Sequence, residues 1–186
     1  KLPIVKSTNI RFSEVADTTL LDCNVILGMN KLNSIAFLPE GTNTAGDLGA
    51  AASLTYENRN LFKGAEVFSV KLRAAFEAIT GLEGYQNQDY EEYSVETKLS
   101  FPRFVAPFLS SDFKKNSSAQ SELAISYNMQ NRPEFHRRVF SAAWRYRWTN
   151  ARRTKNYKID LLDLNYIYMP WMSSKFKHDY LDSVSN

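Results

Sequence analysis

The sequence predicts an all-β fold, an antiparallel meander that forms part of a transmembrane β-barrel. Three observations predict it. Apolar and polar residues alternate in several separate stretches, and successive residues of a strand point to opposite faces of a sheet. One set of positions is aliphatic or aromatic and the other is charged, as expected for a sheet between lipid and water. No stretch approaches the about 18 consecutive apolar residues of a membrane-spanning helix.

The clearest alternation lies in residues 65–79, where Phe68, Val70 and Leu72 alternate with the polar residues Ser69 and Lys71. The same period of two returns in residues 47–57, 93–101, 119–129 and 138–148. Composition alone does not reveal the pattern, because a mean hydropathy of −0.40 and 23% charged residues are ordinary values for a soluble domain.

The first elements form a short module. Residues 5–15 and 18–29 predict two strands that pair as a hairpin, and residues 32–38 predict a strand that is weak or lies at a sheet edge and that Pro39 ends. Residues 40–47 form a polar turn cluster before the strand at 47–57. Residues 58–64 are a tight connection to the strand at 65–79.

The remaining elements continue the meander. A loop at 80–91 leads to the strand at 93–101, and an aromatic turn at 101–108 contains two prolines that a strand interior does not tolerate. Strands follow at 119–129, 138–148 and 157–168, with a bulge near Leu161 where the alternation slips. Seven strands follow residue 30, fewer than the about eight of the smallest bacterial barrels, so the chain predicts an incomplete barrel.

Four short motifs carry a family resemblance. Residues 40–44 (EGTNT), 56–66 (YENRNLFKGAE), 99–104 (LSFPRF) and 164–166 (LNY) occur in this order, and their arrangement resembles the opening half of the barrel in the BamA/TamA outer-membrane assembly family, also called the bacterial surface-antigen family. The family's Val-Arg-Gly-Phe/Tyr motif does not occur in the chain.

The resemblance implies two regions and an orientation. Residues 1–30 are then the C-terminal hairpin of a periplasmic POTRA domain, and residues 31–186 the N-terminal part of the barrel in the bacterial outer membrane. The turns at 58–64, 101–118 and 149–156 face the periplasm, and the loops at 40–47, 80–91, 130–135 and 171–186 face outside. The best motif is the periplasmic turn, made of Asn58, Arg59, Asn60, Leu61, Phe62 and Gly64.

The resemblance also implies a mechanism without catalysis. The first barrel strand acts as a lateral gate that offers its edge to an incoming strand, whose unpaired backbone groups are costly in lipid. The expected partners are outer-membrane lipid, unfolded outer-membrane proteins and accessory assembly subunits. The candidate gate strand consists of Leu32, Asn33, Ser34, Ile35, Ala36, Phe37, Leu38 and Pro39. The alternative is that this strand is simply short.

Within that frame two further groups of residues have predicted places. An aromatic girdle at the membrane interface comprises Trp144, Tyr146 and Trp148. Charges that face an aqueous lumen are Lys71, Arg73, Glu77, Glu96, Lys98, Arg145 and Arg147.

Three other interpretations stay open. A passive outer-membrane porin or transport barrel has the same alternation, and a soluble β-sandwich also alternates because both sheets face one core. Residues 136–153 interleave basic and aromatic side chains as a nucleic-acid-binding domain does. In one strand, however, the rings and the charges of that stretch fall on opposite faces, so no nucleic-acid partner is expected.

The sequence does not favour an enzyme or a cofactor. The two histidines, His136 and His178, have no partner at metal-ligand spacing, and the single cysteine Cys23 excludes both an intrachain disulfide and a CxxC metal site. Acidic residues between 89 and 96 could imitate a catalytic carboxylate pair, but the sequence around them does not predict an apolar pocket. We therefore expect no catalytic residues, no metal site and no bound cofactor.

Overall fold

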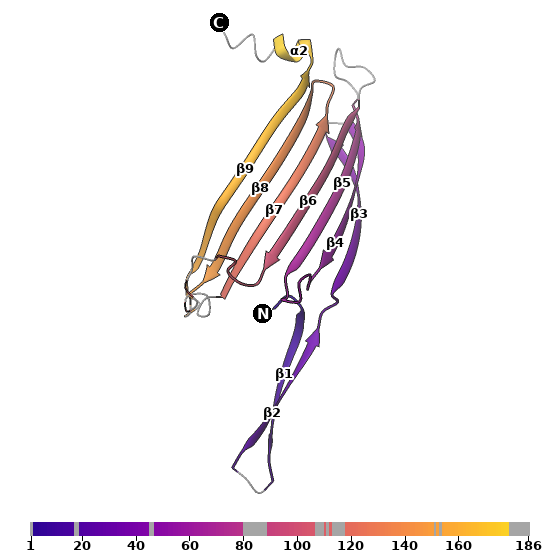
Figure 1. Ribbon diagram of the computed structural model, residues 1–186. Helices are drawn as coiled ribbons and strands as arrows, with labels where there is room; N and C mark the ends of the chain where they lie inside the picture. Colours follow the sequence, from indigo (N-terminus) through magenta and orange to yellow (C-terminus); the bar gives the residue numbers. More distant parts are fainter. Residues whose placement is uncertain are drawn as a thin grey trace.

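The computed structural model describes residues 2–16, 19–44, 47–79, 89–106, 118–150 and 154–178, together with residues 110, 112 and 152. Its described part consists almost entirely of two antiparallel sheets, which confirms the all-β prediction (Figure 1). Among the described residues, no helix has both the length and the apolar character needed to cross a membrane.

The first sheet is a two-stranded hairpin that projects from one end of the larger sheet (Figure 1). It consists of β1 (Val5–Glu14) and β2 (Leu21–Met29), close to the predicted bounds. Asn30 fastens its base, because the Asn30 backbone N–H donates to the Ile4 carbonyl at 2.8 Å and its Nδ2 donates to the Pro3 carbonyl at 2.9 Å.

The second sheet is a seven-stranded meander in which every strand pairs with its neighbours in sequence. The number of strands after residue 30 is therefore as predicted. The strands are β3 (Asn33–Thr44), β4 (Asp47–Asn58), β5 (Val67–Ala78), β6 (Tyr90–Phe101), β7 (Ser118–Asn131), β8 (Phe135–Thr149) and β9 (Asn156–Met172), and a one-turn helix, α2 (Ser174–Lys177), follows.

The structure corrects the prediction for the start of this sheet. Strand β3 does not end at Pro39 but continues to Thr44, and most of the predicted turn at 40–47 is strand. Within the described residues β3 pairs with β4 alone, so it is an edge strand, where a residue without a backbone N–H is tolerated. The predicted loop at 80–91 lies mostly outside the described residues, and its last two positions belong to β6.

The structure confirms the predicted bulge. Trp144 pairs with Leu162 and the next residue, Arg145, pairs with Asp160, so Leu161 is the extra residue in β9. Beyond the bulge the alternation resumes on the same faces. Strand β9 is longer than predicted and continues to Met172.

The pairing register gives the seven-stranded sheet two chemically different faces. On one face, the polar face, the small residues Ala51, Ser53, Ala75 and Ala143 are buried. Large side chains on the opposite apolar face stay exposed. Figure 1 shows that the sheet is curved. Because small side chains are buried on the polar face while large ones are exposed on the apolar face, the polar face is the concave side.

The two ends of the sheet also differ. We call the end that contains residues 59–66, 102–106 and 150–155 the hairpin end, because β1 and β2 project from it (Figure 1). The opposite end, with residues 132–134 and α2, is the helix end. Within the described residues β9, like β3, pairs with a single neighbour, so this part of the sheet is open at both edges.

Candidate membrane-facing surface and edge strand

The apolar face extends without interruption across all seven strands. Side chains that are opposite each other in the register, such as Leu54 and Leu72, fall on this same face. Many are exposed, from 38% for Tyr56 to 73% for Ile35. The large apolar members that are exposed are Ile35, Phe37, Leu48, Leu54, Tyr56, Leu72, Phe76, Tyr93, Val95, Ile125, Tyr127, Phe140, Tyr157, Ile159, Leu162, Leu164, Tyr166 and Tyr168.

This face carries no charged side chain along the middle of the strands. Its charged or ionisable residues, Glu91, His136 and Arg138, lie at the helix end. On β5 the apolar row runs from Phe68 to Ala78. At about 3.3 Å per residue this row is about 33 Å long, and at a tilt of about 40° it covers about 25 Å, the height of the apolar band of outer-membrane barrels.

The apolar face also has a shallow groove. Small residues, Ala52 and Ala74, lie between the larger side chains of Phe37, Tyr93 and Tyr127 and leave a hollow of about 530 Å³. Nearly all of its lining is apolar, which matches hydrocarbon chains better than water.

The polar face carries the charged residues that the sequence assigned to a lumen. All seven lie on this face: Lys71, Arg73, Glu77, Glu96, Lys98, Arg145 and Arg147. They pair across strands, since Arg73 Nη1 lies 2.5 Å from Glu40 Oε2 and Arg145 Nη1 lies 3.2 Å from Glu122 Oε1. Lys98 pairs with Glu96 on the same strand. Trp144, Tyr146 and Trp148 lie on the opposite face, so these rings and the β8 cations Arg145 and Arg147 do not form one surface.

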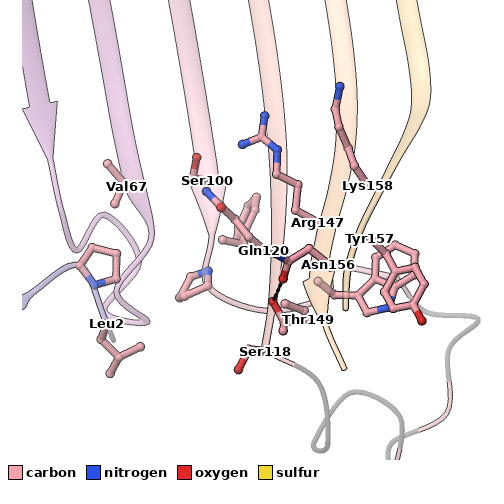
Figure 2. A pocket seen from close by; sticks show the side chains of 15 residues that line it. Leu2, Val67, Ser100, Ser118, Gln120, Arg147, Thr149, Asn156, Tyr157 and Lys158 are labelled. Atoms are coloured by element: carbon pink, nitrogen blue, oxygen red, sulfur yellow. Dashed lines mark hydrogen bonds between the residues drawn. The ribbon is translucent and has the colours of Figure 1, made fainter. Parts of the chain in front are cut away.

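A hollow of about 780 Å³ lies at the hairpin end of the sheet, and residues of both faces line it, together with Leu2 near the N-terminus (Figure 2). Leu2 and Val67 border one side. Arg147 and Lys158 extend along the strands on the other side (Figure 2). Lys158 Nζ lies 2.8 Å from Asp160 Oδ2 and Arg147 Nη1 lies 3.5 Å from Glu122 Oε2, so acidic groups already balance these cations.

The candidate gate strand is regular. The register of β3 and β4 runs from Asn33 opposite Asn58 to Thr44 opposite Asp47 without a shift. Asn33 Oδ1 accepts hydrogen bonds from Asn58 Nδ2 at 2.7 Å and from the Tyr56 hydroxyl at 3.0 Å, which fixes the first pair. Leu32, which the sequence included in the strand, precedes it, and its carbonyl accepts from the Arg59 N–H at 2.8 Å.

The beginning of the sheet is tightly packed around Gly49. A Cβ atom at this position would collide with the Glu77 side chain, the Phe76 carbonyl and the Thr42 hydroxyl. Only glycine lets β3, β4 and β5 approach this closely.

The predicted periplasmic turn is held by side chains that bond to its own backbone. Asn58 Oδ1 accepts from the Asn60 N–H at 3.0 Å, and Asn60 Oδ1 accepts from the Ala65 N–H at 2.9 Å. Glu66, only 1% exposed, accepts from the Gly64 N–H at 2.9 Å. A Cβ on Gly64 would collide with the Glu66 carboxylate, so glycine is needed here for space.

Two features of this turn were not predicted. The left-handed conformations occur at Lys63 (φ 64°) and Ala65 (φ 61°), not at the glycine. Glu66 is a buried carboxylate: burial raises its pKa, but backbone N–H groups and Arg103 lower it more, so the net pKa lies below the ordinary value of 4.5. Arg103 Nη2 lies 3.5 Å from Glu66 Oε1.

The predicted aromatic girdle is partly covered. After β6, residues 102–106, which we call the strap, lie across the apolar face at the hairpin end. Phe104 is buried there, with its ring centroid 5.9 Å from that of Tyr146 and 5.6 Å from that of Trp148. Tyr146 is therefore only 8% exposed, and the prediction that the strap is simply a turn misses this packing.

Ser121 is the residue that fastens the strap. Its Oγ accepts from the Val105 N–H at 2.9 Å and donates to the Arg103 carbonyl at 2.8 Å, and the Tyr146 hydroxyl donates to the Val105 carbonyl at 2.9 Å. Ser121 is completely buried. The sequence counted it among outward-facing residues, and its one signal was a hydroxyl in an apolar row.

A second unpredicted polar cluster lies near the helix end on the polar face. The Tyr90 hydroxyl donates to Glu92 Oε2 at 2.5 Å, Asn128 Nδ2 donates to Glu92 Oε1 at 2.6 Å, and the Arg132 guanidinium lies 4.8 Å from the Tyr90 ring centroid. The residues come from β6, β7 and the turn after β7. Tyr90 and Arg132 fell in the predicted loops at 80–91 and 130–135, and the contacts of the cluster depend on the register.

Comparisons of this chain with protein-family models, curated proteins and solved structures found no match. The resemblance to the BamA/TamA family therefore depends on the short motifs alone and stays a prediction.

Proposed function

We propose that the chain is part of an outer-membrane protein assembly factor whose apolar face contacts lipid and whose polar face borders water. One observation carries the proposal: a broad, exposed apolar face without charges along the middle of seven neighbouring strands. Soluble monomers rarely expose apolar patches larger than about 300–600 Å². Contact with lipid removes the free-energy cost of exposing this apolar surface to water, and the charged side chains of the polar face remain hydrated.

The proposed gate is the free edge of β3. In lipid, each unpaired backbone N–H or C=O group costs several kcal/mol, so an edge strand stays unpaired there only at high free energy. An incoming unfolded strand pairs with β3 and satisfies both sets of backbone groups at once. The regular register of β3 with β4 supports this role, because an undistorted strand is the best template for the next one.

The membrane part of the proposal is tested by the lipid exposure of neighbouring residues. In a Cys23→Ser background, Val95→Cys and Ser94→Cys introduce thiols on the apolar and polar faces of β6, and each thiol carries an environment-sensitive fluorophore. In vesicles, brominated acyl chains quench the label at position 95 much more than the label at position 94. Equal quenching at both positions would overturn the lipid-facing assignment.

The gate is tested by cross-linking in the intact protein that contains this chain. Ala36→Cys places a thiol on β3, and the matched control Thr55→Cys places one on its register partner in β4, which has neighbours on both sides. With an unfolded outer-membrane protein that carries one cysteine in a terminal strand, adducts form at position 36 and not at position 55. A cysteine bridge from position 36 to the last barrel strand should also block assembly activity.

Two outcomes would favour other functions. Full assembly activity with the bridged first strand rejects the gate, and a passive channel then explains the same sheet. Salt-dependent binding of an oligonucleotide by the purified protein would favour the nucleic-acid interpretation, which the opposite placement of Arg145 and Trp144 disfavours.

A further inference from the structure

The hairpin end of the apolar face combines aromatic rings with positive charge. The Phe104, Trp148 and Tyr157 rings form a row, since the Trp148 centroid lies 5.6 Å from that of Phe104 and 5.1 Å from that of Tyr157. Arg103 precedes Phe104 in the strap. Arg152 and Lys155 belong to the turn that joins the strands of Trp148 and Tyr157. We call these six residues the rim patch.

The strap holds Arg103 in a defined place. Hydrogen bonds from Ser121 and Tyr146 satisfy the strap backbone at Arg103 and Val105, so this irregular segment tolerates a medium with little water. The Arg103 side chain is 67% exposed. The strap therefore presents a cation at the edge of an apolar surface.

Side-chain hydrogen bonds also hold the described residues at the two ends of the connection between β8 and β9. Asn150 Oδ1 accepts from the N–H groups of Thr154 and Lys155, at 2.8 and 3.1 Å. Lys155 has the same strand parity as Tyr157, which puts it on the apolar side, and both Arg152 and Lys155 are exposed. Trp148 and Tyr157 stack at an interplanar angle of 17° beneath the turn.

Acidic groups balance only part of this charge. Residues 102–106, 118–120, 148–150, 152 and 154–158 contain no carboxylate. Arg103 has an acidic partner, the buried Glu66, whose Oε1 lies 3.5 Å from Arg103 Nη2. The cations Arg147 and Lys158 on the polar face also have acidic partners.

From this arrangement we propose that the rim patch binds the phosphate headgroup of an anionic phospholipid. Guanidinium and ammonium groups bind phosphate oxygens, and aromatic rings beside an apolar band lie at headgroup level. The acyl chains of the same lipid then lie along the exposed apolar face. This inference rests on the proposed membrane location and adds lipid selectivity to it.

The test measures which lipid surrounds the rim in vesicles. In a Trp171→Phe background the remaining tryptophans, Trp144 and Trp148, lie at the hairpin end. Brominated phosphatidylglycerol should quench their fluorescence in preference to brominated phosphatidylcholine, by about fivefold for each cation engaged. Replacing Arg103, Arg152 and Lys155 with Gln should abolish the preference, and high salt should weaken it.

A matched control separates a local site from overall charge. Replacing Arg132, Lys175 and Lys177 with Gln removes the same charge at the helix end and should leave the preference unchanged. Equal quenching by both brominated lipids in protein that inserts would overturn the rim patch alone. Displacement of the preference by soluble glycerol phosphate would also overturn it, because the site would then bind free phosphate. Absence of quenching by either lipid would overturn the membrane location itself.

Discussion

At the scale of single residues, the turn between β4 and β5 depends on a buried carboxylate. Glu66 accepts the Gly64 N–H, contacts Arg103 and fills the space where a Gly64 side chain would lie. The motif in residues 58–64 indicated a tight turn. It did not indicate Glu66, because glutamate is almost never fully buried and a single sequence carries no signal for such an exception.

Glu66→Gln should destabilise the folded chain by about 1–3 kcal/mol at neutral pH, because a charge-assisted acceptor of backbone N–H groups is lost. The measurement is urea unfolding of protein folded in micelles. Gly64→Ala should destabilise as well, because its Cβ collides with the carboxylate. Lys63→Ala in the same turn is the control. It should have a small effect, because lysine and alanine both carry a Cβ and Lys63 already adopts the left-handed conformation.

The same carboxylate makes stability depend on pH. Its pKa is lower in the folded chain than the ordinary value of 4.5. Its stabilisation is therefore fully present above that ordinary value and is lost as pH falls through the lower, folded-state pKa. Between about pH 5 and about pH 3 the unfolding midpoint of the unaltered chain should fall more than that of Glu66→Gln. Parallel pH profiles would show that Glu66 does not contribute.

At the scale of elements, the strands were easier to predict than the strap, which packs onto the apolar face of the sheet. Alternation is a local property, so it indicated nearly every strand and the bulge at Leu161. The two prolines after Phe101 correctly excluded a ladder. The packing of Phe104 against Tyr146 joins residues that are far apart in sequence, and no local pattern reports such contacts.

Ser121→Ala should release the strap. The substitution leaves the Val105 N–H and the Arg103 carbonyl without their partner, which costs about 1–3 kcal/mol for buried groups. Hydrogen exchange at Val105 should accelerate at least tenfold, equivalent to about 1.4 kcal/mol, while exchange in β8 stays unchanged. The matched control is Thr97→Val, which removes a hydroxyl from β6 on the same apolar face of the sheet. Unchanged exchange at Val105 would contradict the anchoring role.

Strand β3 shows a second limit of local patterns. Its alternation is poor and Pro39 indicated an end, yet twelve residue pairs join it to β4. Proline breaks a strand only where its missing N–H is needed by a neighbour. Pro39 did suggest an edge position, which the described residues confirm, but the length of the strand depends on its pairing with β4 and could not be inferred from residues 32–44 alone.

At the scale of the whole molecule, one face must meet lipid if the proposal holds. Ile125→Arg places a charge at the middle of the apolar face of β7, and Ser126→Arg places it on the polar face opposite Glu96. In vesicles the first substitution should destabilise by about 2–4 kcal/mol and the second by much less. Unfolding by guanidinium, followed by tryptophan fluorescence, measures both. Similar losses for the two variants would contradict a lipid-facing surface.

The sequence predicted the all-β fold, the N-terminal hairpin and the seven strands that follow residue 30 in the described part of the chain. These properties follow from a period of two and from turn residues. The identity of neighbours such as Glu122 and Arg145 required the register, which depends on contacts between distant segments. Function is the hardest property to infer from this sequence, because the motifs that suggest it are short.

The two free edges of the large sheet are not equivalent. The β3 ladder is unbroken, whereas the β9 ladder shifts register near His136 and again at Leu161. A β-bulge twists an edge strand locally and hinders its pairing with a further strand. If strands are added to this sheet as proposed, an added strand can pair in continuous register with β3, whereas the bulges of β9 would interrupt its pairing at the other edge.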